Sequence, residues 1–133
     1  MGRVLILETT FLVDLERERL REAPGPAHRF LASHSAERLH VTAITAGELA
    51  AGASDEERPA WDELLGRFRI LSIDREVCWR YGRLFSYLKD NGLLIAGNDL
   101  WIAAIAVSNG LPLATRNERH FRRIPELRVV GYR

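Results

Sequence analysis

Short apolar runs that alternate with helical patterns are the feature that most limits how this 133-residue chain can fold. The first run, Val4–Leu7, is continuous, which is typical of a strand buried on both faces of a parallel sheet. Strands that alternate with helices predict an α/β fold with a central, mostly parallel sheet flanked by helices. The five predicted strands are residues 4–7, 39–43, 69–73, 112–115 and 127–130.

Capping residues and periodicity place the helices between these strands. Asp74 is a predicted N-cap for a long helix at 75–90, which the Asn91-Gly92 pair ends. Asn98 is a second predicted N-cap, before a helix that is apolar almost all round. The length and the lack of a linker predict one domain, residues 1–133. The predicted helices are 11–22, 27–34, 46–53, 59–68, 75–90 and 100–107, with a polar loop at 116–125.

Composition excludes several classes of protein. With 47% hydrophobic and 28% charged residues, the chain is not intrinsically disordered. The longest apolar stretch, Leu100–Val107, is far shorter than the run of about 18 residues that a membrane span needs, so we expect no membrane association. Cys78 is the only cysteine, which excludes an internal disulfide and a cysteine-based zinc site. The N-terminus lacks the pattern of a signal peptide, and we expect a cytoplasmic protein.

Charge is balanced overall but unevenly placed. The formal net charge is +1, and all of the basic residues except Lys89 are arginine. Residues 116–133 hold six arginines, and Glu118 and Glu126 are the only acids there. Arginine suits phosphate and carboxylate partners, so this basic end predicts a polyanion or an acidic peptide as partner. A solvated surface explains the composition equally well.

Three acids lie where ligand sites form in such folds, outside the carboxyl ends of the strands. Glu8 directly follows the first strand, Glu48 lies one turn into the helix after the second, and Asp99 opens the apolar helix before the fourth. Asn117 lies just beyond the fourth strand. Gathered carboxylates need a counter-charge, and a hard divalent cation with oxygen ligands is the usual one. We therefore expect a metal site here.

Each acid also has a structural explanation. Thr45-x-x-Glu48 matches a capping box, as does Ser54-x-x-Glu57. The helix dipole favours Asp99 in a first turn, and Glu8 could simply end a strand. The coincidence of three acids at strand ends favours the functional interpretation.

Four segments resemble PIN-domain ribonucleases, and most of all the VapC-type toxins of bacterial and archaeal toxin–antitoxin pairs. They occur in the order of that family and together cover essentially the whole chain, and the segment around Asp99 is the most specific. The segments are Leu5–Asp14, Thr42–Gly52, Gly97–Ala104, and Leu113–Asn117 followed by His120-Phe121.

The resemblance implies a PIN-like sandwich, endonucleolytic cleavage of RNA, and Mg²⁺ or Mn²⁺ as cofactor. It implies that Glu8, Glu48 and Asp99 form the catalytic, metal-binding acidic cluster, with Asn117 as a further metal ligand. Its expected partners are a second copy of the chain, in a homodimer, and a VapB-like antitoxin that inserts an arginine or an apolar helix near the acids. Two residues are candidates for weak RNA contacts, Arg116 and Arg119.

The chain departs from the family at two positions. The first acid is usually Asp, and Glu8 is one methylene longer, so its side chain must either fold back or push the ion toward Asp99. Asn117 stands at the fourth acidic position and supplies no charge, with His120 nearby. The alternative hypothesis is therefore a degenerate module that binds antitoxin or RNA without cleaving.

Two further interpretations concern helices. Asp14 is expected on the polar face of the first helix. The aromatic residues of the long helix are expected in the core or on a dimer surface; they are Trp79, Tyr81, Phe85 and Tyr87, together with Leu88.

Overall fold

A five-stranded sheet forms the centre of the molecule. The computed structural model describes residues 3–35 and 37–133, and its strand order is β3-β2-β1-β4-β5. Each of the four strand pairings is parallel, which confirms the predicted α/β class. The strands are β1 (Val4–Leu7), β2 (Arg38–Thr42), β3 (Arg69–Leu71), β4 (Leu113–Ala114) and β5 (Val129–Val130).

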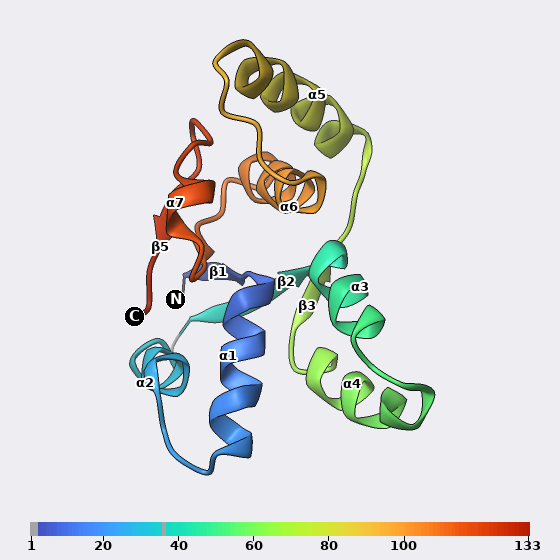
Figure 1. Cartoon of the computed structure of the whole chain (residues 1–133), viewed down its shortest axis with the longest axis vertical. Helices are drawn as coiled ribbons and strands as arrows, with labels where there is room; N and C mark the ends of the chain where they lie inside the picture. The colour runs from blue at the N-terminus through green and yellow to red at the C-terminus, as the bar shows by residue number, and fades with distance from the viewer. Residues whose placement is uncertain (1–2, 36) are drawn as a thin grey trace.

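Helices cover both faces of this sheet (Figure 1). Alternate residues of β1 point to opposite faces: Leu5 and Leu7 pack with α1, α2 and α3, whereas Ile6 packs with α5 and α6. The result is a three-layer sandwich with one apolar core on each side of the sheet. The helices are α1 (Thr9–Leu20), α2 (Pro26–Ser33), α3 (Ala43–Ala51), α4 (Arg58–Leu65), α5 (Arg75–Asp90), α6 (Gly97–Ser108) and α7 (Glu118–Phe121), with a short 3₁₀ helix at Asp55–Glu57.

Helices α1 and α3 begin earlier than predicted because the strand before each runs straight into its N-cap. The prediction started the first helix at residue 11, but Glu8 is the N-cap of α1 and its carboxylate accepts a hydrogen bond from the backbone N–H of Thr10. Likewise Thr42 ends β2 and caps α3 by accepting from the backbone N–H of Thr45. Both helices therefore start at the carboxyl edge of the sheet.

The second half of the chain shows one confirmed helix and two revised ones. Helix α5 has the predicted bounds, and Asp74 caps it by accepting from the N–H of Val77. Helix α6 begins at Gly97 with Ala96 as its N-cap, so Asn98 lies inside the first turn and not at the cap. The predicted polar loop at 116–125 contains the short helix α7.

The strand order creates a switch point beside β1. The chain goes from β1 to β2 and β3 on one side, whereas β4 and β5 lie on the other. The backbone N–H of Glu8 donates to the carbonyl of Ala114 at 2.9 Å, which brings the residues after β1 and β4 next to each other. Such a switch point is where α/β sheets bind ligands. In the part of the chain that is described, no helix has the length and apolar character needed to cross a bilayer.

Candidate active site

Glu8 is buried at the switch point and folds back onto its own helix. Only 2% of the residue is exposed. One carboxylate oxygen, Oε2, accepts from the backbone N of Thr10 at 2.7 Å, from Thr10 Oγ1 at 2.6 Å and from Thr115 Oγ1 at 3.2 Å. Of the two conformations that the extra methylene allows, the structure therefore has the one in which the carboxylate caps α1.

Glu48 reaches across to helix α1. Its Oε1 accepts a hydrogen bond from Thr9 Oγ1 at 2.7 Å, and its Oε2 accepts one from Asn98 Nδ2 at 3.5 Å. Thr9 also contacts Thr45 through their hydroxyls, 2.8 Å apart. The side chain of Glu48 thus faces the other candidate residues, and the capping-box interpretation of Thr45-x-x-Glu48 is wrong. The other predicted capping box, Ser54-x-x-Glu57, is present: the side chain of each residue accepts a hydrogen bond from the backbone N–H of the other.

Asp99 interacts electrostatically with both other acids. Burial, more than any other cause, raises the pKa of Asp99, and the charge of Glu48 raises it further. Burial likewise raises the pKa of Glu8, and the charge of Asp99 adds to this effect. His120 acts in the opposite direction and lowers the pKa of Asp99. Asp99 is therefore the acid that couples Glu8 to Glu48.

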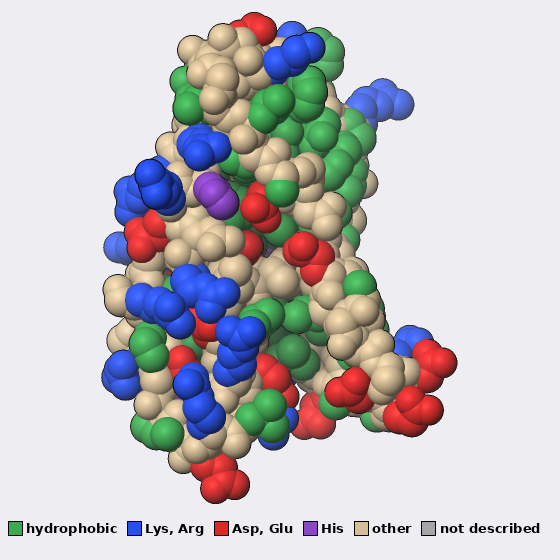
Figure 2. Space-filling model, viewed as in Figure 1, with side chains coloured by type: hydrophobic (Ala, Val, Ile, Leu, Met, Phe, Trp, Pro, Cys, Tyr) green, Lys and Arg blue, Asp and Glu red, His purple; other side chains and the backbone are tan. Residues whose placement is uncertain are grey.

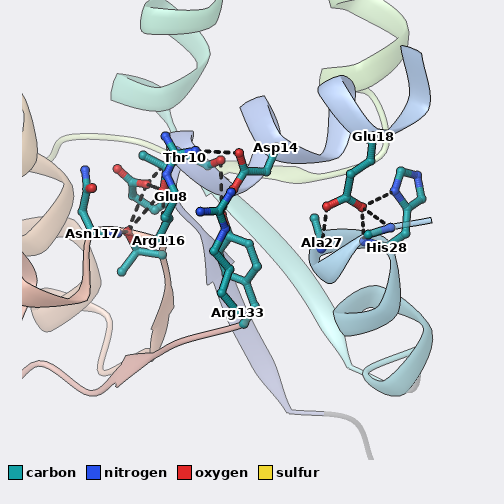
Figure 3. Close-up of polar contacts among 12 residues, drawn as sticks. Glu8, Thr10, Asp14, Glu18, Ala27, His28, Arg116, Asn117 and Arg133 are labelled. Carbon is teal, nitrogen blue, oxygen red and sulfur yellow. Dashed lines mark hydrogen bonds and ion pairs between the residues drawn. The ribbon is translucent and has the colours of Figure 1, made fainter. Parts of the chain in front are cut away.

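Asn117 lies beside Glu8, as Figure 3 shows. Its backbone N–H donates to Thr115 Oγ1 at 2.9 Å, and the same hydroxyl contacts Glu8. Its side chain makes no capping hydrogen bond to α7, although Asn117 is the N-cap residue. The side-chain amide of Asn117 therefore does not cap α7.

Threonine hydroxyls orient the acids, and the sequence analysis assigned them no role. Thr10 and Thr115 hold Glu8, and Thr9 holds Glu48. Their signal in the sequence was position: Thr9 and Thr10 come directly after Glu8, as a pair, and Thr115 directly follows β4. Because threonine is also common in strands and at caps, position alone did not separate a structural role from an orienting one.

The two arginines predicted to contact RNA, Arg116 and Arg119, lie in different surroundings. Arg116 is half-buried, and its Nη1 donates to Asp14 Oδ1 at 2.7 Å, whereas Arg119 is exposed. Asp14 is 4% exposed, so the expectation that it lies on a polar helix face is wrong. It is buried because residues far along the chain fold over helix α1 and pair with it.

The donor set suits a hard divalent cation. Carboxylates and an amide oxygen are preferred ligands of Mg²⁺ and Mn²⁺, and burial, followed by the charge of a neighbouring carboxylate, raises the pKa of both Glu8 and Asp99. Among residues 3–35 and 37–133, no three His, Cys, Asp or Glu side chains are arranged to hold an ion by themselves. That geometry still fits Mg²⁺, which keeps several waters and uses one or two carboxylates together with substrate phosphate.

Charge on this face is segregated. Figure 2 shows acidic side chains near the middle of the face and a band of Lys and Arg to their left. Acids whose oxygens suit a cation, next to a basic surface, form an arrangement that suits a phosphodiester, because the flanking phosphates of such a strand are negative.

Comparison with known proteins agrees with this architecture. The model of the PIN domain family matches residues 5–127. Ribonuclease VapC1 of Methanocaldococcus jannaschii is 30% identical over 96% of this chain and 86% of the relative. Ribonuclease VapC1 of Haemophilus influenzae strain R2866 is also 30% identical, over 93% of this chain and 94% of the relative.

Solved structures of the same kind superpose along nearly the whole chain. VapBC-1 from nontypeable Haemophilus influenzae has a TM-score of 0.82 and 29% identity, and the match covers 97% of this chain and 98% of that one. VapBC2 from Rickettsia felis, solved with a DNA fragment of its promoter, has a TM-score of 0.80 and 26% identity over 98% and 99% of the two chains. The chain belongs to the PIN-domain family, among the VapC ribonucleases.

Proposed function

We propose that this protein is a metal-dependent RNA endonuclease that acts as the toxin of a VapBC-type pair in the cytoplasm. The observation that carries the proposal is that Glu48, at the switch point of the sheet, hydrogen-bonds to the residues next to Glu8 and Asp99, which are Thr9 and Asn98. The names of the VapC relatives support RNA cleavage, and the VapBC structures support a toxin–antitoxin pair.

The acids would hold Mg²⁺ or Mn²⁺. Asp99 and Glu48 are the principal ligands in this proposal, with Glu8 and Asn117 as further oxygen donors. A divalent ion supplies an activated water for in-line attack on a phosphodiester and offsets negative charge on the phosphate oxygens.

The protein's own contribution is orientation and charge. Thr9 fixes Oε1 of Glu48, whose Oε2 accepts a longer hydrogen bond from Asn98, and Thr10 with Thr115 fixes Oε2 of Glu8. Arg116 and Arg119 provide positive charge for the phosphates of the strand.

A cleavage assay tests this function directly. The purified chain should cut RNA in Mg²⁺ or Mn²⁺ and stop in excess chelator, and Asp99→Asn should lose activity. Asp90→Asn, an exposed acid at the end of α5, is the matched control and should cut like the wild type. Equal metal-dependent cleavage by Asp99→Asn would contradict the assignment of the site.

The partner in this proposal is a VapB-like antitoxin. A partner arginine could pair bidentately with the clustered carboxylates and so compete with the ion. Co-expression with the gene of a neighbouring VapB-like protein should yield a stable complex with suppressed cleavage. Failure to co-purify would count against the pair and would leave the nuclease assignment to the cleavage assay.

A module that binds without cleaving is the second candidate. The observation that favours it is the engagement of Glu8 Oε2 by three donors, since this carboxylate oxygen is directed to the helix and not to an ion. Binding of RNA or antitoxin with no cleavage in either metal, across several RNAs, would select this candidate.

A further inference from the structure

Asp14 is a buried carboxylate with three partners that lie far from it in the sequence. It accepts from Arg116 Nη1 at 2.7 Å and from Tyr132 Oη at 2.6 Å, and Arg133 Nη2 lies 3.4 Å from its second oxygen. Its side chain is only 6% exposed, whereas 30% of Arg116 and 57% of Arg133 reach the surface. Figure 3 shows both arginines converging on Asp14.

This cluster has more positive charge than a structural pair requires. One arginine is enough to compensate one buried carboxylate, but here two guanidinium groups share it, so the cluster carries a net charge of +1. Each guanidinium has five N–H donors in a planar fork, and the contacts to Asp14 occupy few of them. Part of each arginine side chain lies at the surface, where the remaining N–H donors can meet another partner.

The cluster adjoins the candidate active site. The backbone N–H of Arg116 donates to Thr10 Oγ1 at 3.0 Å, and that hydroxyl donates to Glu8 Oε2 at 2.6 Å. Tyr132 Oη also contacts the carbonyl of Thr10, at 3.3 Å, and its ring packs against Phe11. The cluster is therefore linked to Glu8 through the hydroxyl of Thr10.

We propose that Asp14 is a positioning residue that holds Arg116 and Arg133 as a subsite for a backbone phosphate of the RNA strand, next to the one that is cleaved. Two preorganised forks suit the planar, bidentate recognition of phosphate oxygens. The inference rests on the proposed nuclease function. It adds the protein contact with the RNA backbone that determines how the RNA enters the site.

RNA binding without cleavage tests the subsite. Anisotropy of a labelled short single-stranded RNA is measured in chelator over a range of salt concentrations. Arg116→Ala and Arg133→Ala should each weaken affinity by about fivefold or more and reduce the slope of log K against log salt by about 0.7. Arg128→Ala is the matched control, an exposed arginine directly before β5, and should change neither quantity.

Asp14→Asn separates positioning from simple charge. The substitution removes a negative charge beside two arginines, so charge alone predicts tighter RNA binding. Positioning predicts the opposite, a loss of affinity comparable to that of Arg116→Ala, because the guanidinium groups are no longer held. A thermal melt checks that this variant is folded, and the arginine variants decide the matter if it is not.

Several results would overturn the subsite. Unchanged RNA affinity in both arginine variants would overturn the subsite. Cleavage of RNA by the wild type would show that the nuclease function still holds. Weaker antitoxin binding with unchanged RNA binding assigns the pair to the protein interface instead. Tighter RNA binding by folded Asp14→Asn would mean that the cluster acts through its net charge and that Asp14 does not position the arginines. A wild type that neither binds nor cuts RNA removes the proposed function itself.

Discussion

At the scale of single residues, position 8 combines two demands. Its side chain must cap α1 and also face Asp99. The three hydrogen bonds from Thr10 and Thr115 all go to one carboxylate oxygen, Oε2. Folding a glutamate back in this way restricts its rotamers, at up to roughly 2 kcal/mol for a buried side chain. An aspartate is a preferred N-cap residue and reaches the helix N–H groups with one torsion fewer.

Glu8→Asp should therefore lower the metal concentration needed for cleavage and raise the rate by roughly tenfold. The measurement is a titration of Mg²⁺ and Mn²⁺ in the cleavage assay with both proteins. Glu8→Gln is the control, which keeps the length without the charge and should be inactive. Equal or lower activity of the aspartate variant would mean that the glutamate is accommodated as the native ligand, or that position 8 does not bind metal.

Asp99→Asn should keep or increase stability while it removes cleavage. The pKa of Asp99 is raised above its ordinary value of 3.8, so its ionised form destabilises the fold. That penalty is absent below the pKa that Asp99 has in the unfolded chain. It grows as the pH rises from there and is complete above the pKa of Asp99 in the folded protein. In urea unfolding, the variant should match the wild type at low pH and equal or exceed it at pH 7. A less stable variant at pH 7 would show that the carboxylate makes favourable contacts.

At the scale of elements, Glu18 joins α1 to α2. Its carboxylate accepts from the backbone N–H groups of Gly25, Ala27 and His28 at 2.9–3.0 Å, and from His28 Nδ1 at 2.7 Å (Figure 3). A Cβ at Gly25 would stand 2.5 Å from this carboxylate, so the turn needs glycine there. One buried acid thus satisfies the start of α2 and closes the turn before it.

Glu18→Gln should lower the free energy of unfolding by about 1.5–3 kcal/mol, since hydrogen bonds to a charged acceptor are lost. Although burial opposes ionisation, the hydrogen bonds from His28, Ala27 and Gly25 lower the pKa of Glu18 from 4.5 to about 2. The stabilisation is therefore present above pH 4.5 and disappears as the pH falls toward 2. Urea unfolding of both proteins across this range measures it.

The matched control is Glu16→Gln, an i,i+3 surface pair with Arg19. Exposed pairs contribute about 1 kcal/mol or less, so its effect should be small at every pH. A gap between wild type and Glu18→Gln that stays constant down to pH 2 would contradict the assignment of the stabilisation to the ionised carboxylate.

At the scale of the whole molecule, helix α5 carries several exposed aromatic side chains. Leu88 is buried and Tyr81 stacks on Trp101 at 3.8 Å, but Trp79, Phe85 and Tyr87 are 63%, 38% and 43% exposed. Figure 2 shows hydrophobic side chains gathered over α5. Exposed apolar surface of this kind marks interaction sites, and we propose that the chain forms a homodimer through it.

Trp79→Glu should shift the protein from dimer to monomer without loss of folding. A buried tryptophan contributes strongly to an interface, and a charge in its place stays unpaired there. Light scattering coupled to size exclusion measures the mass. Leu20→Glu is the control, at an apolar residue that is 69% exposed at the end of α1, and should not change it. A dimer that survives Trp79→Glu would place the interface elsewhere.

Local patterns determined much of this protein from the sequence alone. The alternation of strands and helices predicted the parallel sheet, and Asp74 with Asn91-Gly92 bounded α5 correctly. These signals depend on neighbours within about four residues, so they are readable without the fold. The placement of acids after strands also predicted the edge of the sheet where the candidate site lies, because parallel strands end at one edge.

Only the tertiary structure decided the partner of each buried charge. Asp14 looked like a surface residue, and it is buried because Arg116, 102 residues away, and Tyr132, 118 residues away, fold over it. Glu48 matched a helix cap, but its hydroxyl partner comes from α1, 39 residues earlier. A carboxylate accepts equally well from a local N–H and a distant donor. The order of the strands determines which donor is within reach, and no local pattern encodes that order.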